Sequence, residues 1–244
     1  HVAVITGGKG AIGWATAKRL AALGARIVSI DRSEPEKVQA LLDSLPKVAS
    51  GAHFALTASI TDTAALNAAA DAVKQRAGRC DILVNSAGFT KPVAANDLEG
   101  LTDELFDEVV QTNLRGVFAT IRAFTPLLKA NGDGLIVNVS SIAGFTGAGS
   151  NLAYAASKAG VDVLTKGLAK ALAPQVRVIA VSPGVVDSSF VPGRGADFND
   201  KAAATIPLKR IGHVDDTAAT IEACATTLRF ATGSRFVVDG GRSL

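Results

Sequence analysis

Short apolar runs alternate along the chain with longer alanine-rich stretches, and this alternation constrains the fold more than any other sequence feature. The short runs are rich in β-branched residues and predict strands at residues 2–6, 26–31, 53–57, 82–85, 135–140, 177–181 and 236–239. In the longer stretches apolar residues recur about every 3.6 positions, which predicts helices at residues 12–23, 63–76, 101–111 and 153–172. Strands that are apolar on both faces and separated by helices are typical of a parallel sheet with helices on both faces. We therefore expect an α/β fold with a doubly wound, mostly parallel sheet.

The residues between these elements support the same division. Pro35 is placed to start a helix, Gly24 and Gly78 to end helices, and Asp62 to cap one. A chain of 244 residues fits one α/β domain. Because no linker, repeat or low-complexity stretch divides it, we expect a single domain over residues 1–244.

The charge distribution argues against two classes of partner. The 25 basic and 22 acidic residues are spread without long runs and leave a formal net charge of +3. This gives no electrostatic basis for binding nucleic acid or an anionic membrane. No apolar run reaches the roughly 18 residues of a transmembrane helix. We therefore expect neither a nucleic-acid nor a membrane partner.

The cysteines and histidines give no sign of a disulfide or a metal site. Cys80 and Cys224 lie far apart in the sequence, which favours a reducing compartment, and we expect the protein in the cytoplasm. His1, His53 and His213 are scattered and lie near no second ligand type at metal spacing. We therefore expect no catalytic metal.

The first predicted strand runs into a glycine-rich turn that opens the first helix, Thr6-Gly7-Gly8-Lys9-Gly10-Ala11-Ile12-Gly13. Glycines permit a tight turn and let backbone N–H groups approach a pyrophosphate, while the helix N-terminus adds roughly half a unit of positive charge. Such a turn is a weak signal alone, but it lies where a Rossmann-like fold binds its dinucleotide. We therefore expect a dinucleotide at this turn.

Asp31 strengthens that expectation and bears on which dinucleotide binds. It ends the second predicted strand, 18 residues beyond Gly13, where a carboxylate can accept hydrogen bonds from the adenosine ribose. A carboxylate there would also repel a 2′-phosphate, which favours NAD(H) over NADP(H). Arg32 and Lys9 oppose this choice, because either cation could contact a phosphate.

Tyr154 is the only tyrosine, and Lys158 follows it by four positions within a predicted helix. This spacing puts both side chains on one face, one turn apart. Free tyrosine has a pKa near 10, and lowering it by about three units takes roughly 4 kcal/mol. One ammonium about 4 Å away contributes a term of about that size at an effective dielectric near 20. The pair could therefore exchange protons with a substrate at neutral pH, although a helical tyrosine more often only packs its ring.

Six short motifs occur in the order seen in the short-chain dehydrogenase/reductase family: residues 6–13, Asn85-Ser86-Ala87-Gly88, Asn113, Ser140-Ser141, Tyr154 with Lys158, and Pro183-Gly184. Each motif is weak alone, but the set is jointly specific. The chain resembles the simple, single-domain branch of this family over essentially its whole length, through Val238-Asp239-Gly240-Gly241.

The resemblance implies a four-residue catalytic site. Tyr154 would exchange a proton with the substrate oxygen, and Ser141 would hydrogen-bond that oxygen, while Ser140 should point elsewhere. Lys158 would hold the nicotinamide ribose and lower the tyrosine pKa. Asn113 would anchor a water molecule that links Lys158 to solvent.

The resemblance also implies a cofactor site that extends from the glycine-rich turn to the nicotinamide end. Its expected residues are Gly7, Lys9, Ala11, Ile12, Gly13, Asp31, Arg32, Ser59, Ile60, Asn85, Ala87, Gly88, Tyr154, Lys158, Pro183, Gly184, Val186 and Ser188. Three positions depart from the family pattern: Ala11 stands at the middle glycine of the turn, Ser86 at the usual second asparagine, and Ser59 where an aspartate often contacts adenine. These departures bear on cofactor affinity and leave the four catalytic positions intact.

Substrate contacts are the least constrained part of the sequence. Residues 188–212, the least patterned segment, would cover the substrate. We expect a largely apolar pocket formed by Ser141, Phe89, Phe145, Asn151, Val185 and Phe190. Lys91 or Arg194 could pair with an anionic substrate group, although a solvated charge is the simpler interpretation of each.

We therefore expect an NAD(H)-dependent oxidoreductase that interconverts a secondary alcohol and a ketone by hydride transfer. Two alternatives stay open: an NADPH-dependent 3-oxoacyl-thioester reductase, and a non-catalytic NAD-binding sensor, against which the complete catalytic set argues. Glycine- and alanine-rich faces at residues 115–129 and 153–172 suit packing between subunits. The resemblance implies a homotetramer.

Overall fold

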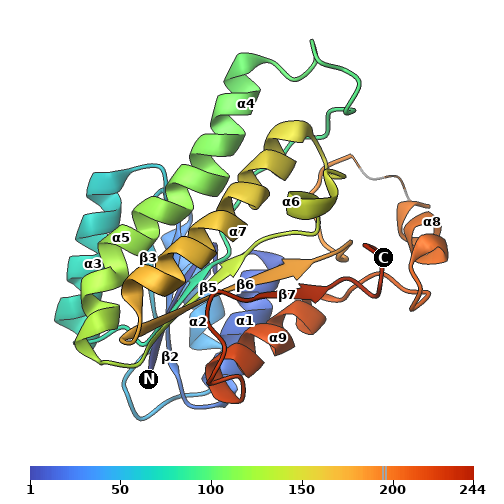
Figure 1. The fold of residues 1–244 in the computed structure, drawn as a ribbon. Coiled ribbons are helices and arrows are strands. Elements are labelled where there is room, and N and C mark those ends of the chain that lie inside the picture. Colours follow the sequence, from blue (N-terminus) through green and yellow to red (C-terminus); the bar gives the residue numbers. More distant parts are fainter. Residues whose placement is uncertain (194, 196) are drawn as a thin grey trace.

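The computed structural model describes residues 1–193, 195 and 197–244, and these form one seven-stranded sheet in which all neighbouring strands are parallel (Figure 1). The strands are β1 (Val2–Thr6), β2 (Arg26–Asp31), β3 (Phe54–Thr57), β4 (Ile82–Asn85), β5 (Gly134–Val139), β6 (Val176–Pro183) and β7 (Arg235–Val238). Their order is β3-β2-β1-β4-β5-β6-β7, so the chain winds outward from β1 and then, from β4, in the opposite direction. The expected doubly wound α/β fold is confirmed, and the sheet is wholly parallel.

Helices cover both faces of this sheet (Figure 1). One face is covered by α3 (Thr63–Ala77), α5 (Gly116–Ala130) and α7 (Leu152–Leu172). The other face is covered by α1 (Ala11–Ala22), α2 (Pro35–Asp43) and α9 (Val214–Thr226). Among the described residues the remaining helices are α4 (Asp103–Val110), the π turn η1 (Gln111–Arg115), α6 (Ala143–Thr146) and α8 (Phe198–Thr205).

The two helix layers enclose two apolar cores, one on each side of the sheet. In β1, Val2 and Val4 face one core while Ala3 and Ile5 face the other. All four side chains are at most 2% exposed. A strand buried on both faces has no polar side to alternate with, which explains the continuous apolar run in the sequence.

The structure differs from the sequence-based expectation mainly between α4 and α5. The expected helix at residues 101–111 begins later, at Asp103, because the Thr102 hydroxyl caps it by accepting a hydrogen bond from Leu105 N at 3.3 Å. It then continues through η1 directly into α5. A π turn inserts one extra residue into a helix and is frequent at functional sites. Here it contains Asn113, which is fully buried.

A buried chain of polar side chains fixes the centre of the sheet at the carboxyl ends of its strands. Asn85 Nδ2, at the end of β4, donates to Asn138 Oδ1 on β5 at 2.9 Å. Asn138 Nδ2 in turn donates to Thr165 Oγ1 on α7 at 2.9 Å. Two strands and one helix are therefore held in register at the edge of the sheet where parallel folds bind their ligands.

Candidate active site

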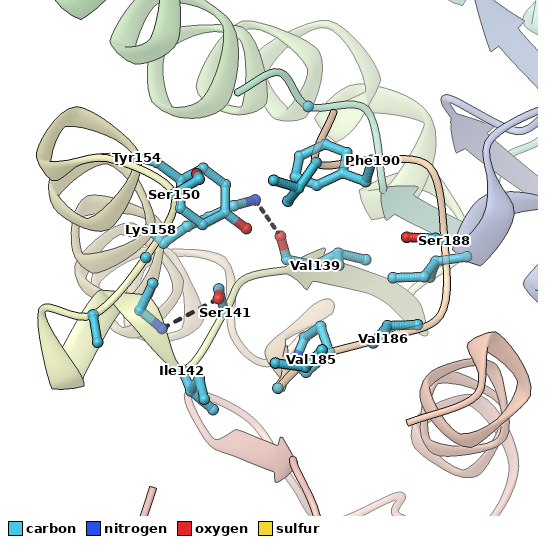
Figure 2. A pocket seen from close by; sticks show the side chains of 18 of the residues that line it. Val139, Ser141, Ile142, Ser150, Tyr154, Lys158, Val185, Val186, Ser188 and Phe190 are labelled. Carbon is cyan, nitrogen blue, oxygen red and sulfur yellow. Dashed lines mark hydrogen bonds between the residues drawn. The ribbon is translucent and has the colours of Figure 1, made fainter. Parts of the chain in front are cut away.

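A cavity of about 890 Å³ opens beyond the carboxyl ends of the strands (Figure 2). Its walls are the first turn of α1, the loops after β4, β5 and β6, the N-terminal part of α7, described residues of segment 188–212, and the C-terminal turn at Arg242. Figure 2 shows Tyr154, Lys158 and Ser141 close together at one side of this cavity, with Ser188 and Val186 at the other. The cavity brings together twelve of the expected site residues: Ala11, Ile12, Gly88, Ser141, Tyr154, Lys158, Pro183, Gly184, Val185, Val186, Ser188 and Phe190.

Tyr154 enters the cavity from the first turn of α7, and Asn151 fixes its backbone. Asn151 is the N-cap of this helix, and its Oδ1 accepts a hydrogen bond from Tyr154 N at 2.6 Å. Its Nδ2 donates to the carbonyl of Lys91 at 2.7 Å, in the loop after β4. The side chain is buried, so the cap is protected from competing water. Asn151 therefore holds the start of α7 against that loop.

Lys158 lies one helical turn further along α7 and is 5% exposed. Its Nζ donates to the carbonyl of Val139 at the end of β5, at 2.7 Å, and lies 5.7 Å from the centre of the Tyr154 ring. Burial lowers the pKa of Lys158 to about 8, although Asp162 one turn later opposes this shift. An amine with that pKa remains mostly cationic at neutral pH. Its positive charge therefore stays beside the tyrosine.

The two serines after β5 both line the cavity, but their hydroxyl groups have different hydrogen-bond partners. Ser140 Oγ donates to the backbone carbonyl of Lys158 at 3.3 Å and so ties β5 to α7. Ser141 Oγ accepts from Ala143 N at 3.2 Å, which keeps its own proton available to a ligand in the cavity. The close approach of α6 to α7 requires Gly144, because a Cβ there would lie 2.8 Å from Ala159 N.

Asn113 does not line the cavity in the described structure, although the family resemblance groups it with the catalytic residues. Its Oδ1 accepts from Phe89 N at 2.8 Å and its Nδ2 donates to the Phe89 carbonyl at 2.8 Å. The amide thus pairs with the backbone of Phe89 as a neighbouring strand would, and Nδ2 also reaches Ser157 Oγ at 3.4 Å. The side chain holds the loop after β4 against η1 and α7.

The glycine-rich turn fits a bound pyrophosphate. Gly7 has φ +67°, and a Cβ there would lie 2.9 Å from Ala87 Cα in the loop after β4. A Cβ on Gly13 would lie 2.2 Å from the Gly7 carbonyl oxygen. The chain therefore closes into a tight cradle that side chains would fill, with Gly10 and Ala11 lining the cavity at the N-terminus of α1. Ala11 itself is exposed, so its methyl group faces open space.

Asp31 lies buried below this turn, at the end of β2. Its Oδ2 accepts from Ser29 Oγ at 2.6 Å, and its Oδ1 accepts from Lys9 N at 3.4 Å. Burial raises the pKa of the carboxyl group, and these hydrogen bonds partly offset the shift. The Lys9 ammonium is bound to Glu34 at 2.5 Å. The Arg32 side chain is exposed and makes no ion pair among the described residues.

Several other expected cofactor residues surround the turn without lining the cavity. Ser59 Oγ forms a hydrogen bond with Thr61 Oγ1 at 2.8 Å, and Ile60 packs against Gly116. Asn85 is buried, and its Oδ1 has no hydrogen-bond partner among the described residues. Such an orphaned acceptor beside the cradle is consistent with a ligand that completes this end of the site.

The nicotinamide end of the expected site is formed by the loop after β6. Pro183, Gly184, Val186 and Ser188 all line the cavity. Gly184 is required there, because a Cβ would lie 2.7 Å from Asp239 Cβ.

Phe190 extends from segment 188–212 to the mouth of the site. Its ring centre lies 6.1 Å from that of Tyr154, and the two rings are tilted relative to each other. Its edge also faces Gly88, where an added Cβ would lie 3.6 Å from the ring. Phe190 and Val185 are therefore the apolar residues of the expected substrate pocket that face the cavity.

Three expected substrate residues lie elsewhere. The backbone of Phe89 is held by Asn113, Asn151 caps α7, and Phe145 on α6 stacks against the Arg235 guanidinium at 3.9 Å. None of the three is among the described residues that line the cavity.

Of the two cations weighed as partners for an anionic substrate group, only Lys91 lies within the described residues. Lys91 is exposed and does not line the cavity, and Arg194 lies outside the described residues. Sequence reasoning missed Arg242, which does line the cavity. The nearby motif Val238-Asp239-Gly240-Gly241 was recognised, but nothing in it indicates that the following residue turns back to the site.

The described residues contain neither a membrane-spanning helix nor a cluster of metal ligands. No helix in the described part of the chain is long and apolar enough to span a membrane. Within residues 1–193, 195 and 197–244, no three or more histidine, cysteine or acidic side chains are grouped as a metal site would require.

Comparison with known proteins extends these observations over almost the whole chain. A family model described as Enoyl-(Acyl carrier protein) reductase matches residues 7–243. The 3-oxoacyl-[acyl-carrier-protein] reductase FabG of Thermotoga maritima is 35% identical, over 98% of this chain and 96% of that protein. FabG of Staphylococcus aureus is 33% identical, with the same coverage of each.

A solved structure agrees with the sequence relatives. Levodione reductase superposes with a TM-score of 0.91 at 31% identity, covering all of this chain and 97% of that one. The sheet order, the cradle after β1 and the Tyr154 and Lys158 pair on α7 are accounted for together by one ancestry. The chain belongs to the short-chain dehydrogenase/reductase family, and it is an oxidoreductase that acts on keto or hydroxyl groups.

Proposed function

We propose that this enzyme interconverts a secondary alcohol and a ketone with NAD(H). The observation that carries the proposal is the meeting of Tyr154, Lys158 and Ser141 in the same cavity as the glycine cradle that opens α1. One part of this cavity suits a pyrophosphate, and another supplies hydroxyl groups for a substrate oxygen. The bound nicotinamide would supply the hydride acceptor or donor.

Each chain residue has a distinct task in this proposal. Tyr154 gives a proton to the substrate oxygen in reduction and takes it back in oxidation. Ser141 donates a hydrogen bond to the same oxygen, because its hydroxyl proton is not used by Ala143. The buried cation of Lys158 favours the phenolate form of Tyr154. Asn113 and Asn151 act as positioning residues, since they hold the loop and the helix that carry these groups.

The cofactor would be held along the floor of the cavity. Gly7 and Gly13 permit the close approach of a pyrophosphate, and the N-terminus of α1 favours its negative charge. Asp31 would accept the adenosine ribose hydroxyls, and Ser188 would meet the nicotinamide amide. Lys158 would contact the second ribose from α7.

The preference for NAD(H) rests on charge at the end of β2. Asp31 would repel a 2′-phosphate, and the neighbouring Lys9 ammonium is already neutralised by Glu34. Arg32 opposes this, since its exposed guanidinium has no acidic partner among the described residues. We take the balance to favour NAD(H), because the carboxylate of Asp31 lies at the end of β2, where it would meet the adenosine ribose, whereas the Arg32 side chain is exposed.

The second candidate is reduction of a 3-oxoacyl thioester with NADPH. It is supported by the similarity to 3-oxoacyl-[acyl-carrier-protein] reductases of two bacteria and by the free guanidinium of Arg32. The two candidates predict that different residues set the cofactor preference. Under the first, Asp31→Ala relaxes the preference for NADH; under the second, Arg32→Ala weakens NADPH binding.

The test is a steady-state assay with NADH and NADPH on neutral ketones, diketones and 3-oxoacyl thioesters. We expect turnover of ketones with NADH and a loss of about a hundred- to ten-thousandfold in Tyr154→Phe. Fluorescence titration should show that Tyr154→Phe still binds NADH. A preference for NADPH with thioesters would establish the second candidate, and full activity of Tyr154→Phe would refute both.

We also propose that the enzyme assembles as a homotetramer. Phe118 on α5 and Val163 on α7 are exposed on the helices whose faces are rich in small residues, and Val237 is exposed on the edge strand β7. Two separate apolar surfaces are what a tetramer with two kinds of contact needs. Light scattering coupled to size exclusion measures the mass directly, and Val163→Glu together with Val237→Glu should give monomers.

A further inference from the structure

We propose that Arg242 is an anion-recognition residue, and that the physiological substrate carries a carboxylate or phosphate group in addition to its alcohol or ketone. This inference rests on the proposed function and adds a substrate class to it. It starts from the charges of the cavity wall. Among the described lining residues there is no aspartate or glutamate, and the charged side chains are those of Lys158 and Arg242.

These two cations differ in how many of their N–H donors already have a hydrogen-bond partner. Lys158 is buried and bound to the Val139 carbonyl beside Tyr154, where it serves the reacting end. Arg242 is exposed at the mouth, and its Nη1 donates to Thr205 Oγ1 at 2.8 Å. The rest of its guanidinium makes no hydrogen bond or ion pair within the described part of the chain. A guanidinium has five N–H donors, so a fork remains open to a ligand.

What distinguishes Arg242 from the other exposed arginines is its place in the cavity lining: Arg32 and Arg122 also lack an ion pair among the described residues, but they do not line the cavity. Arg210 is paired with Asp216, Arg229 with Asp133 and Arg79 with Asp81. These arginines are neutralised by a neighbouring acid, whereas Arg242 forms no ion pair with a described residue, and the carboxylate of Asp239 in its own turn accepts backbone hydrogen bonds instead. An anionic ligand would supply the missing partner.

The C-terminal turn holds Arg242 in place before any ligand arrives. Both oxygens of Asp239 accept backbone hydrogen bonds, from Gly241 N and Ser243 N, each at 2.8 Å. Gly240 has φ +66°, and a Cβ there would lie 2.7 Å from Ile206 Cγ2, so the turn packs tightly against the residues after α8. Leu208 N also donates to the Gly240 carbonyl at 3.1 Å.

Thr205 completes the orientation of the guanidinium. Its hydroxyl donates to the Ala202 carbonyl at 2.8 Å and therefore presents a lone pair to Arg242. Two acids of this segment are occupied elsewhere, since Asp187 accepts from Asn199 and Asp197 pairs with Lys201, and Asp200 on α8 does not line the cavity. One oriented cation therefore lines the same cavity as the reacting hydroxyls, and no carboxylate is among the described lining residues. Carboxylate and phosphate both match a guanidinium fork, so the experiment must distinguish them.

The test uses two matched pairs of ligands on the complex of the full chain with NADH. One pair is 4-oxopentanoate and its methyl ester; the other is dihydroxyacetone phosphate and dihydroxyacetone. Isothermal titration should show that the anion of at least one pair binds about tenfold or more tighter than its neutral partner. The pair with the larger ratio identifies the group.

Arg242→Leu should abolish that ratio, while Arg242→Lys should keep part of it, because charge remains but the fork is lost. Arg229→Leu, which removes an equal charge far from the cavity lining, should leave the ratio unchanged. NADH affinity should be equal in all four proteins. Equal binding of acid and neutral partner in both pairs, including no detectable binding, overturns the inference. So does a ratio that survives in Arg242→Leu, or a loss of NADH affinity in that variant.

The same samples separate this inference from the proposed function. NADH oxidation is followed by absorbance with each ligand and with a panel of neutral ketones. Turnover of neutral ketones without any anion preference retains the oxidoreductase proposal and rejects the role of Arg242. An anion preference without turnover of any ketone supports the anion site and rejects the proposed reaction.

Discussion

The two sides of the cavity are built differently. The reacting side, which consists of Ser141, Tyr154 and Lys158 with the helix α7 behind them, is mostly buried and hydrogen-bonded to backbone at several points. The cover, which consists of the described residues of segment 188–212 with the C-terminal turn, exposes large side chains such as Phe190 and Leu208, the latter 67% exposed. One side fixes atoms in place, whereas the other presents a surface that can vary.

This difference separates chemistry from recognition. A proton-transfer group must be held within fractions of an ångström, which requires a rigid and buried support. Substrate choice requires only a complementary surface, and such a surface can lie on an irregular segment with few internal bonds. Substitutions on the two sides should therefore differ in both size and kind of effect.

Among the residues that support Tyr154, the largest effect is expected from Lys158→Met on the reacting side. Removing a cation that is buried beside Tyr154 should lower turnover about a hundred- to thousandfold, because the phenolate loses its electrostatic support. Lys166→Met is the matched control, since Lys166 is an exposed lysine on the same helix. Steady-state kinetics measure both variants. Equal activity of the two would show that the buried charge is not used.

The same lysine predicts how stability depends on pH. Its folded pKa of about 8 lies below the ordinary value of 10.5. Between these values the unfolded chain holds a proton that the folded chain lacks, so the free energy of unfolding rises with pH over this window. Below pH 8, where both states are protonated, the buried ammonium lowers the free energy of unfolding by a constant amount of up to about 3 kcal/mol. This penalty is relieved as the pH rises toward 10.5. Urea unfolding at several pH values, with Lys158→Met as reference, measures it; parallel curves would contradict the buried-amine interpretation.

A smaller effect is expected from Asn151→Ala, which removes the cap from the Tyr154 amide and the bond to Lys91. We expect a loss of about 1–2 kcal/mol in unfolding free energy, together with lower turnover because Tyr154 is displaced. Thr102→Ala removes the cap of α4, which is exposed and remote from the cavity. It should cost about 1 kcal/mol or less and leave turnover unchanged. If both variants had the same kinetics, the cap would be only structural.

The smallest effect on stability is expected in the cover. Phe190→Ala should change the free energy of unfolding by no more than about 0.5 kcal/mol, because the ring is already 41% exposed. It should raise the substrate KM by roughly tenfold, since the ring forms part of the mouth. Phe230→Ala, a fully exposed phenylalanine outside the cavity lining, should change neither quantity. A large destabilisation by Phe190→Ala would place the cover within the folded core.

How much could be predicted from the sequence follows the same division. The strands buried on both faces were recognisable from continuous apolar runs, and their ends shifted by no more than two residues. The grouping of Tyr154, Lys158 and Ser141 followed from helical spacing and from motif order, because such groups must keep fixed separations to work together.

The cover carries no comparable pattern, and there the predictions were weaker. Helix α8 was not predicted, because Phe198–Thr205 has little apolar periodicity. Arg242 was missed because its approach to the cavity depends on two glycines with left-handed φ and on packing against residues distant in the sequence. Phe89, Phe145 and Asn151 do not line the cavity in the described structure, and residue type alone does not distinguish a cap or a stacking partner from a ligand contact.

The small bridge between Val186 and Gly212 has a consequence for how such enzymes diversify. Asp187 N donates to the Gly212 carbonyl, and Gly212 N donates to the Val185 carbonyl. The two ends of the segment that follows β6 are therefore held side by side. Closing a longer excursion costs little, since the entropy penalty grows only with the logarithm of its length. Length changes in this stretch that spare the buried Ile206 and its packing against Gly240 can therefore be accommodated without moving the strands. New specificities can arise there while the proton-transfer apparatus is inherited unchanged.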